Sequence, residues 1–452
     1  MELFTKILSE LGNFVWGPPM LVFLVGTGIY LTYKIRGLQF TMLPYALKLA
    51  FSKAGRKSDG NEHEGDVSHF QSLMTALAAT IGTGNIAGVA TAVVSGGPGA
   101  VFWMWVTAIV GMATKYAEAV LSVKYRVKDD NGEMAGGPMY FLAKGLNMPR
   151  LGWAFAFFGV VASFGIGNLV QVNSVAQAVN ESFGISLVAS GVAMALFTGA
   201  VVIGGIKSIG TVTGYLVPIM AVFYVLGGLG IILLNIEKVP MAIGIILSDA
   251  FTGEAMAGGA VGTVIRYGVA RGVFSNEAGL GSAPIAAAAA KTDHSGRQAL
   301  VSMTGTFLDT IVVCSITGIA VVMTGLWKDG QVKGVALTTR AFQDLLPGEF
   351  SGLIVTFGLI MFAYSTVLGW CYYGEKCMEY IGGTKSVKWY RLIFSCAVYL
   401  GAVMKLELVW DIADVFNGLM AIPNLIGLVL LAKVVVSETD DFKKIKEAEE
   451  AN

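Results

Sequence analysis

Long apolar segments recur along the 452-residue chain and are separated by short polar connections. The segments are continuous and lack the period-two alternation of a transmembrane β-strand, so each must close its backbone hydrogen bonds within a helix. Windows of about 19 residues identify helices that cross a bilayer. The pattern predicts an all-α integral membrane protein with about eleven transmembrane helices. These are expected near residues 14–34, 70–94, 100–123, 151–178, 184–204, 212–235, 258–290, 298–325, 350–374, 390–406 and 410–432.

The composition agrees with a chain that needs lipid as its solvent. Hydrophobic residues make up 55% of the chain and charged residues 14%, whereas soluble globular proteins are about one quarter charged. No cleavable signal peptide is expected, because no small-residue cleavage motif follows the first apolar segment. The four cysteines have no spacing typical of a zinc site or a disulfide framework.

Lys and Arg residues are distributed unevenly among the polar connections. Most of the 31 lie in the C-terminal tail or in the loops at 34–69, 123–151, 205–211, 291–297 and 375–391. The positive-inside rule therefore predicts a cell-membrane protein with its N-terminus outside and its C-terminus in the cytoplasm. This orientation places the basic loop at 326–349 outside the cell, where it is expected to hold a short helix along the membrane surface. Lys115 and Glu118 share one helix face and are expected to form a structural pair near the cytoplasmic end.

Two glycine-rich segments indicate an internal repeat. GTGNIAG at 82–88 and GLGSAPI at 279–285 each lie inside an apolar span. The number of spans between them makes the second copy enter the membrane in the opposite sense. We therefore expect two inverted five-helix repeats, and the chain divides into an N-terminal helix with its basic loop, repeat 1, an external loop, repeat 2 and a cytoplasmic tail, at 1–69, 70–235, 236–257, 258–432 and 433–452.

Paired glycine interruptions in two inverted halves indicate a transporter binding site near the bilayer midplane. Glycine permits backbone conformations that break a helix, and the freed N–H and C=O groups then face an aqueous cavity. Half-helix N-termini suit a carboxylate, and unwound carbonyls suit a sodium ion or an ammonium group. For one isolated motif, close helix packing would be the commoner explanation. The matched pair favours the binding site.

Three polar side chains at membrane depth need either a partner or a function. Asn85 either bonds to a neighbouring helix or lines the site. Glu277 either couples to an ion or a proton, or pairs with Arg271 or Arg266 on its own helix. Asp309 is a lone carboxylate in an apolar span, which makes it a candidate for the cation path.

Four segments are similar to signature sequences of the alanine/glycine:cation symporter family. They are ATIGTGNIAG at 79–88, GMATKYAE at 111–118, GGPMY at 136–140 and GVFSNEAGLGSAP at 272–284. The resemblance runs over nearly the whole chain. It implies a leucine-transporter-like fold with a broken first helix in each repeat. It also implies uptake of alanine or glycine, driven by Na⁺ or H⁺ through alternating access, with no cofactor.

The same resemblance implies roles for individual residues. Amides of the first broken helix would bind the substrate carboxylate together with Gln171, and polar groups of the second would lie near the amino group. Hydroxyls of the ninth span would meet carbonyls of the first broken helix around a sodium ion, and Trp370 would wall the pocket. The candidate substrate-binding residues are Thr83, Gly84, Asn85, Gln171, Asn276, Glu277, Thr366 and Trp370. The candidate ion-binding residues are Ala78, Ile81, Asn85, Ser275, Ser365, Thr366 and Asp309.

Three other function classes fit the sequence less well. A membrane enzyme would need a nucleophile or metal constellation, but the histidines, His63, His69 and His294, lie in or beside loops and form no metal motif. A channel would favour a continuous pore with polar rings over two dissimilar broken helices. A substrate sensor with the same fold is an alternative that the sequence does not exclude. The expected partners are a small amino acid and the bilayer; nucleic acid is not expected, and no protein partner is indicated.

Overall fold

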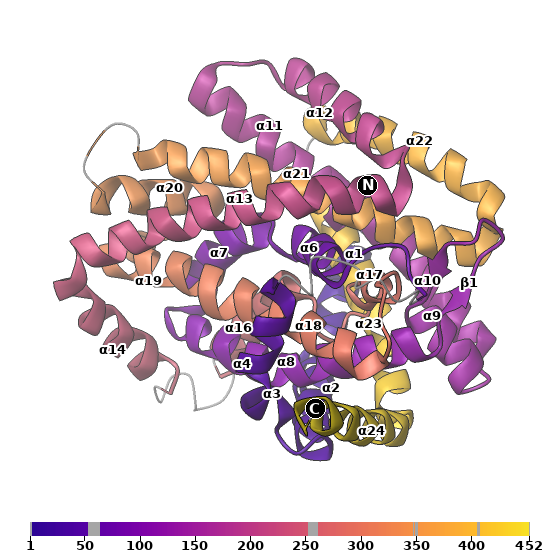
Figure 1. Ribbon diagram of the computed structural model, residues 1–452. Coiled ribbons are helices and arrows are strands. Elements are labelled where there is room, and N and C mark those ends of the chain that lie inside the picture. The colour runs from indigo at the N-terminus through magenta and orange to yellow at the C-terminus, as the bar shows by residue number, and fades with distance from the viewer. Residues whose placement is uncertain are drawn as a thin grey trace.

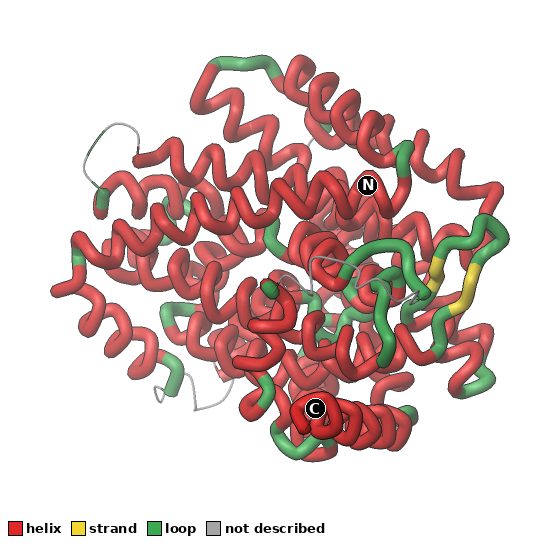
Figure 2. The backbone as a smooth tube through the Cα atoms, viewed as in Figure 1, coloured by secondary structure: helices red, strands yellow, loops and turns green. Residues whose placement is uncertain are grey.

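The computed structural model describes residues 2–52, 64–251, 261–346, 348, 351–404 and 407–451. Parts of the predicted basic loop, of the predicted external loop and of the predicted 258–290 span lie outside these residues. Apart from loops, the described chain is helical, with one antiparallel hairpin formed by β1 (Val127–Lys128) and β2 (Met134–Ala135) (Figure 2). The all-α expectation is therefore confirmed.

The helices follow one another along the chain, with short π- and 3₁₀-helical segments, marked η, between them. The first half contains α1 (Glu2–Val15), α2 (Pro18–Lys34), α3 (Leu38–Thr41), α4 (Leu43–Phe51), α6 (His69–Thr80), η1 (Gly84–Gly88), α7 (Val89–Gly96), α8 (Gly99–Lys124), α9 (Pro138–Tyr140), η2 (Phe141–Gly145), α10 (Pro149–Phe164), η3 (Gly165–Leu169), α11 (Val170–Phe183), α12 (Leu187–Val202) and α13 (Gly205–Leu234). The second half contains η4 (Ile236–Lys238), α14 (Val239–Asp249), α16 (Val261–Asn276), α17 (Pro284–Ala288), α18 (Ser295–Thr306), η5 (Phe307–Cys314), α19 (Ser315–Thr324), η6 (Leu326–Asp329), α20 (Gly334–Leu345), α21 (Ser351–Gly382), α22 (Thr384–Val403), α23 (Glu407–Leu430) and α24 (Ala432–Ala451).

Among the described residues, seven helices are long and apolar enough to cross a membrane, and a bent pair makes up to eight. The seven are Glu10–Lys34, Gly99–Lys124, Pro149–Phe183, Gly205–Leu234, Ser295–Thr324, Ser351–Gly382 and Ile412–Leu430. The other predicted spans coincide with helices that are shorter, interrupted or more polar, namely α12, α16 with α17, and α22. The chain is thus a multi-pass membrane protein, and the total of eleven spans stays a prediction.

Two apolar helices are interrupted where the glycine-rich segments occur. The first break separates α6 from η1, and the helices on its two sides are bent by 50°. The second break follows α16, where Glu277, Gly279 and Gly281 all have positive φ angles of 57°, 92° and 84°. Glycine adopts this left-handed backbone without steric cost, and Pro284 then starts α17 with the φ angle that a first helical turn needs.

The two broken helices lie in the interior of the molecule. α6 packs against α13 and α21. α16 packs against α8, and α8 also packs against α18 (Figure 1). The exposed side of α13 is apolar and includes Tyr215, Ile219 and Leu226, as expected for a helix that faces lipid. The fold therefore places polar main-chain groups of both breaks among packed helices and away from the lipid-facing surface.

Three predicted segments differ in detail from the structure. The 350–374 span continues as α21 to Gly382, because the charges of Lys376 and Glu379 pair with each other at 2.8 Å inside the protein. The external loop at 236–257 contains α14, an apolar helix of 11 residues that is too short to span a bilayer. The loop at 326–349 holds a helix as expected, but α20 buries one face, and Thr338 donates a hydrogen bond to the carbonyl of Ile86 at 3.0 Å.

Candidate functional site

At the first break, hydroxyls of α21 meet main-chain carbonyls of α6. Thr366 Oγ1 donates to the carbonyls of Ala78 at 3.1 Å and Ile81 at 3.3 Å, and Ser365 Oγ lies 3.3 Å from the Ala78 carbonyl. Both hydroxyls also contact the Phe362 carbonyl of their own helix, at 3.0 and 2.8 Å. The structure thus brings together four of the predicted ion-binding residues as an all-oxygen cluster, the donor type that sodium sites at unwound helices use.

The substrate-side residues of the first break lie next to this cluster. Thr83 N–H donates to Gln171 Oε1 at 3.2 Å, while Gln171 Nε2 donates to the carbonyl of Ile166 at 3.0 Å. Thr83 Oγ1 is buried and has no hydrogen-bond partner among the described residues. A buried hydroxyl without a partner costs free energy, so this atom is available to a polar ligand.

Gly82 lies between the oxygen cluster and Gln171. A Cβ atom at this position would lie 2.5 Å from Thr366 Oγ1 and 3.2 Å from Gln171 Oε1. Because such a contact with Thr366 is too close for any side chain, only glycine lets the backbone approach both groups. Gly82 therefore lies between the candidate ion-binding residues and the residues expected to bind the substrate carboxylate.

Asn85 joins the first break to Asp309 on the neighbouring span. Its Oδ1 accepts a hydrogen bond from Gly82 N–H at 2.9 Å, and its Nδ2 donates to Asp309 Oδ1 at 2.7 Å. Ser275 Oγ and Thr310 Oγ1 donate to Asp309 Oδ2 at 2.8 and 2.7 Å. The predicted ion-binding residues Asn85, Ser275 and Asp309 thus share one fully buried polar cluster.

The second break lies against the first. A Cβ atom on Gly84 would come 3.1 Å from the Phe274 ring and 3.5 Å from the Cα atom of Ser275, so Gly84 permits close contact between η1 and α16. Phe274 also lines a cavity of about 170 Å³, together with residues that include Trp16, Arg271 and Asp414. The Phe274 ring therefore lies beside both this cavity and the first break.

Polar side chains of the second break form hydrogen bonds that stabilise its turn. Asn276 Oδ1 accepts a hydrogen bond from Ala278 N–H at 3.0 Å, and its Nδ2 donates to Thr310 Oγ1 at 3.1 Å. Glu277 accepts from Ser282 Oγ at 2.7 Å. Its carboxylate also lies in the electrostatic field of Lys115 and beside Trp370.

Of the two alternatives for Glu277, pairing with Arg271 or Arg266 is not found among the described residues. Arg271 lies 3.8 Å from Asp414, and Arg266 donates to Asn13 Oδ1 at 2.7 Å. The left-handed backbone at Glu277 turns the chain at the end of α16, so the helical spacing that would align these side chains does not apply there. Glu277 is thus available to the interior site.

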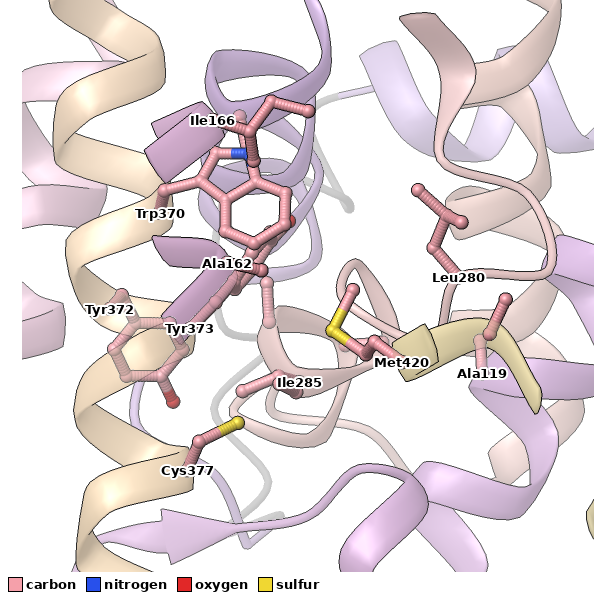
Figure 3. Packing of buried hydrophobic residues seen from close by; sticks show 14 of the residues in the cluster. Ala119, Ala162, Ile166, Leu280, Ile285, Trp370, Tyr372, Tyr373, Cys377 and Met420 are labelled. Atoms are coloured by element: carbon pink, nitrogen blue, oxygen red, sulfur yellow. The ribbon is translucent and has the colours of Figure 1, made fainter. Parts of the chain in front are cut away.

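Trp370 follows Thr366 by one turn of α21 and is almost fully buried. Its side chain packs over Gly167, where any Cβ atom would collide with it, and its indole meets the Tyr373 ring edge to face at 5.6 Å between centroids. Figure 3 shows the indole beside Ile166 of η3. Trp370 therefore packs between α21 and η3, beside the helix turn that carries Thr366.

Several residues at the site were not predicted. Thr310 and Cys314 bond to Asp309 and Asn85 from the π-helix η5, whose wider turn changes which positions share a face. The expected pair of Lys115 with Glu118 does not form, because Lys115 Nζ is buried without a hydrogen-bond partner among the described residues. Glu118 instead binds the second break. Its position inside an apolar span was the available signal.

No group of three or more His, Cys, Asp or Glu side chains that could hold a metal ion occurs in the described part of the chain. The site instead offers carbonyls, hydroxyls, amides and separate carboxylates. Such groups can bind a zwitterion and an alkali cation, and they form no metal centre of the kind that polarises a substrate.

Comparison with known proteins identifies the family. The family model described as the sodium:alanine symporter family matches residues 1–452. The sodium/alanine symporter AgcS of Methanococcus maripaludis is 61% identical, with 99% of each chain covered. The amino-acid carrier protein AlsT of Bacillus subtilis (strain 168) is 35% identical, over 98% of this chain and 92% of AlsT.

A solved structure shows the fold. The crystal structure of MhsT in complex with L-phenylalanine matches with a TM-score of 0.60 at 15% identity, covering 83% of this chain and 98% of that chain. The fold is thus that of leucine-transporter-like proteins. With a family match along its whole length, the chain belongs to the sodium:alanine symporter family, a family of transporters and not of enzymes.

Proposed function

We propose that this protein is a secondary active symporter that imports alanine together with Na⁺ by alternating access. The observation that carries the proposal is the arrangement around Gly82, with an oxygen cluster on one side and Gln171 with Thr83 on the other. A site of this kind binds cation and substrate through neighbouring groups of the same unwound segment. The family match and the similarity to a sodium/alanine symporter support the same assignment.

In this proposal the substrate binds between the two breaks. The carboxylate takes hydrogen bonds from the unpartnered Thr83 Oγ1, from Thr83 N–H once it leaves Gln171 Oε1, and from Gln171 Nε2 once it leaves the carbonyl of Ile166. Glu277 and Asn276 face the ammonium group. Trp370 limits the room for the side chain, which favours alanine and also admits glycine.

The cation binds at the oxygen cluster of the first break. Na⁺ would replace the hydroxyl protons as the partner of the carbonyls of Ala78 and Ile81, and the hydroxyls of Ser365 and Thr366 would turn their lone pairs toward it. Asn85, Ser275 and Asp309 form a second candidate cluster, whose carboxylate suits either a cation or a proton. Proton coupling is thus the alternative at that cluster.

The architecture proposed with this function has eleven spans. Repeats at 70–235 and 258–432 each begin with one of the broken helices, and the N-terminal helix stands outside them. Support comes from the two breaks and from α12, α22 and the interrupted α16 and α17, which complete the count if they also cross the membrane. The N-terminus lies outside the cell and the C-terminus in the cytoplasm, as the Lys and Arg distribution favours.

The proposal is tested by uptake of labelled alanine into proteoliposomes that contain the purified protein. We expect saturable, concentrative uptake under an inward Na⁺ gradient and none when choline replaces Na⁺. A parallel arm with an inward proton gradient and no Na⁺ separates the two coupling ions. Absence of concentrative uptake from correctly inserted protein under either gradient would reject the symporter and favour a substrate sensor.

A further inference from the structure

One buried carboxylate outside the proposed site holds the second break in place. Glu118 Oε1 accepts hydrogen bonds from the main-chain N–H groups of Gly279 at 3.0 Å and Gly281 at 3.2 Å. The same oxygen accepts from Asn424 Nδ2 at 2.7 Å, and Asn424 also donates to the Gly279 carbonyl at 2.9 Å. The polar groups that the break removes from the helix are thus satisfied by side chains of α8 and α23.

This contact is part of a longer polar stripe on α8. Ser122 Oγ, one turn beyond Glu118, donates to the Pro284 carbonyl at 2.7 Å. Residues spaced by four lie on one face of a helix, so Glu118 and Ser122 share a face of α8. Arg126, just beyond the end of α8, donates to the carbonyls of Ala288 at 3.0 Å and Ala290 at 2.7 Å. These three side chains together follow the second broken helix from its turn along α17.

The backbone of α8 comes close to the break on the same face. A Cβ atom on Gly111, two turns before Glu118, would lie 2.9 Å from the Cβ atom of Ala278. A Cβ atom on Gly281 would lie 2.8 Å from Cγ of Asn424. The break therefore has little room to move while these contacts last.

Glu118 is suited to its role because it is fully buried. Hydrogen bonds to a carboxylate are stronger than those to a neutral acceptor, and no water in the membrane interior can replace a lost acceptor. Removing Glu118 would leave three buried donors without their partner. An unsatisfied donor in a protein interior is costly, so the turn should shift or open.

We propose that Glu118 is a positioning residue for the substrate half of the site. By holding Gly279 and Gly281 it sets the turn in which Asn276 and Glu277 are presented to the substrate. It has no contact with the oxygen cluster at Ala78, which belongs to the first break. The inference rests on the proposed function, because it takes the transported amino acid as the ligand that Asn276 and Glu277 bind.

The test compares Glu118→Ala, Glu118→Gln and the control Ser122→Ala, which removes a hydrogen bond from the same helix face one turn away. Alanine and Na⁺ affinities of the purified protein are measured separately. In Glu118→Ala the alanine Kd should rise about ten- to hundredfold, with the Na⁺ Kd in the absence of alanine changed by less than about twofold. Glu118→Gln keeps an acceptor oxygen and should lose less alanine affinity.

Hydrogen exchange supplies a readout that needs no substrate. Amides of Gly279 to Ala283 should exchange faster in Glu118→Ala and Glu118→Gln than in Ser122→Ala, while those of Ala78 to Thr83 stay protected. Unchanged exchange at Gly279 and Gly281, or an equal loss of alanine and Na⁺ affinity, would overturn the inference. Failure of the proposed function shows separately, as absence of alanine uptake by the unmodified protein.

Discussion

Gly82 is the residue at which the two halves of the proposed function meet. A Cβ atom there would meet the Thr366 hydroxyl and the Gln171 amide group, and Gly82 N–H donates to Asn85 Oδ1. If Thr366, Gln171 or Asn85 moves on ligand binding, we expect the Gly82 backbone and the other two side chains to move with it, because they are tightly packed around this residue. Coupling between cation and substrate is therefore expected to depend on this residue.

The first prediction concerns Gly82→Ala. The new methyl group would force Thr366 Oγ1 away from the carbonyls of Ala78 and Ile81, so both Na⁺ and alanine should bind about tenfold more weakly or worse. Gly88→Ala is the matched control, because a Cβ atom there meets no other atom within 4 Å. Equilibrium binding to both variants gives the answer, and equal affinities would contradict the proposed role of Gly82.

The second prediction separates cation binding from general packing. Thr366→Ala removes one hydroxyl of the oxygen cluster and should raise the Na⁺ concentration for half-maximal uptake by about five- to thirtyfold. Thr356→Ala on the same helix removes a buried hydroxyl that contacts Ser182 and not the break, and it should leave the Na⁺ dependence within about twofold. If both variants shift equally, Thr366 has no special role in the ion site.

Most site residues could be identified from the sequence because they lie in or beside glycine-rich motifs. Thr83, Asn85 and Ser275 are examples, and the structure brings them to one buried region. Other partners could not be predicted from spacing. Asn424 reaches Glu118 from α23, and such a contact depends on how distant helices pack.

At the scale of elements, α24 is the least expected contributor. The sequence predicts only a cytoplasmic tail at 433–452, whereas the helix formed there packs on α8 and α18 (Figure 1). Glu438 accepts a hydrogen bond from Ser295 at 2.6 Å and pairs with Lys124 at 2.7 Å, and Thr439 accepts one from Tyr116 at 3.1 Å. The tail is thus attached to the end of α8, the helix that holds the second break.

The third prediction uses the charge of Glu438. Burial opposes its ionisation, but the hydrogen bonds from Lys124 and Ser295 outweigh burial and hold the pKa of Glu438 below its usual range. A lowered carboxyl pKa stabilises the folded protein above the ordinary value of about 4.3 and loses this effect as pH falls through the lowered pKa. Glu438→Gln should therefore reduce the thermal stability at neutral pH and flatten its decline in acid.

The control for this change is Glu447→Gln, at an exposed position of the same helix. Thermal unfolding of the purified protein across the acidic range is the measurement. If Glu438→Gln and Glu447→Gln follow the same pH profile, the attachment of α24 does not depend on this carboxylate.

The elements that hydropathy predicts best are the long uninterrupted spans. α8 lies within one residue of its predicted limits, and α13 ends within one residue of its limit but begins seven residues early. Hydropathy fails where a helix carries charges that pair inside the protein, as in the last turns of α21, or where a helix is too short to span, as in α14. Both depend on contacts that a local average of hydrophobicity does not contain.

At the scale of the whole molecule, the family and the fold are established, whereas the orientation in the membrane is a proposal. The fourth prediction tests it with single cysteines in a background that lacks the exposed Cys396. Glu237→Cys should react with a membrane-impermeant maleimide in intact cells, and Glu447→Cys only after permeabilisation. The reverse pattern would place the C-terminus outside.

The sequence could predict where two apolar helices are interrupted, because both glycine-rich segments are visible in the order of residues, whereas the inverted-repeat layout stays a prediction. It could not predict how the breaks meet. The contact of Gly84 with Phe274 and Ser275 joins residues nearly two hundred positions apart, and the space between α8, α16 and α21 that encloses them results from the packing of the complete set of helices.

The central claim is that one unwound segment binds cation and substrate together, and the most direct test is their mutual effect on affinity. Alanine Kd is measured on the purified protein at saturating Na⁺ and in choline, and Na⁺ Kd with and without alanine. We expect each ligand to tighten the other by the same factor, about tenfold or more, since binding linkage is reciprocal. Equal alanine affinity in Na⁺ and in choline would contradict the account.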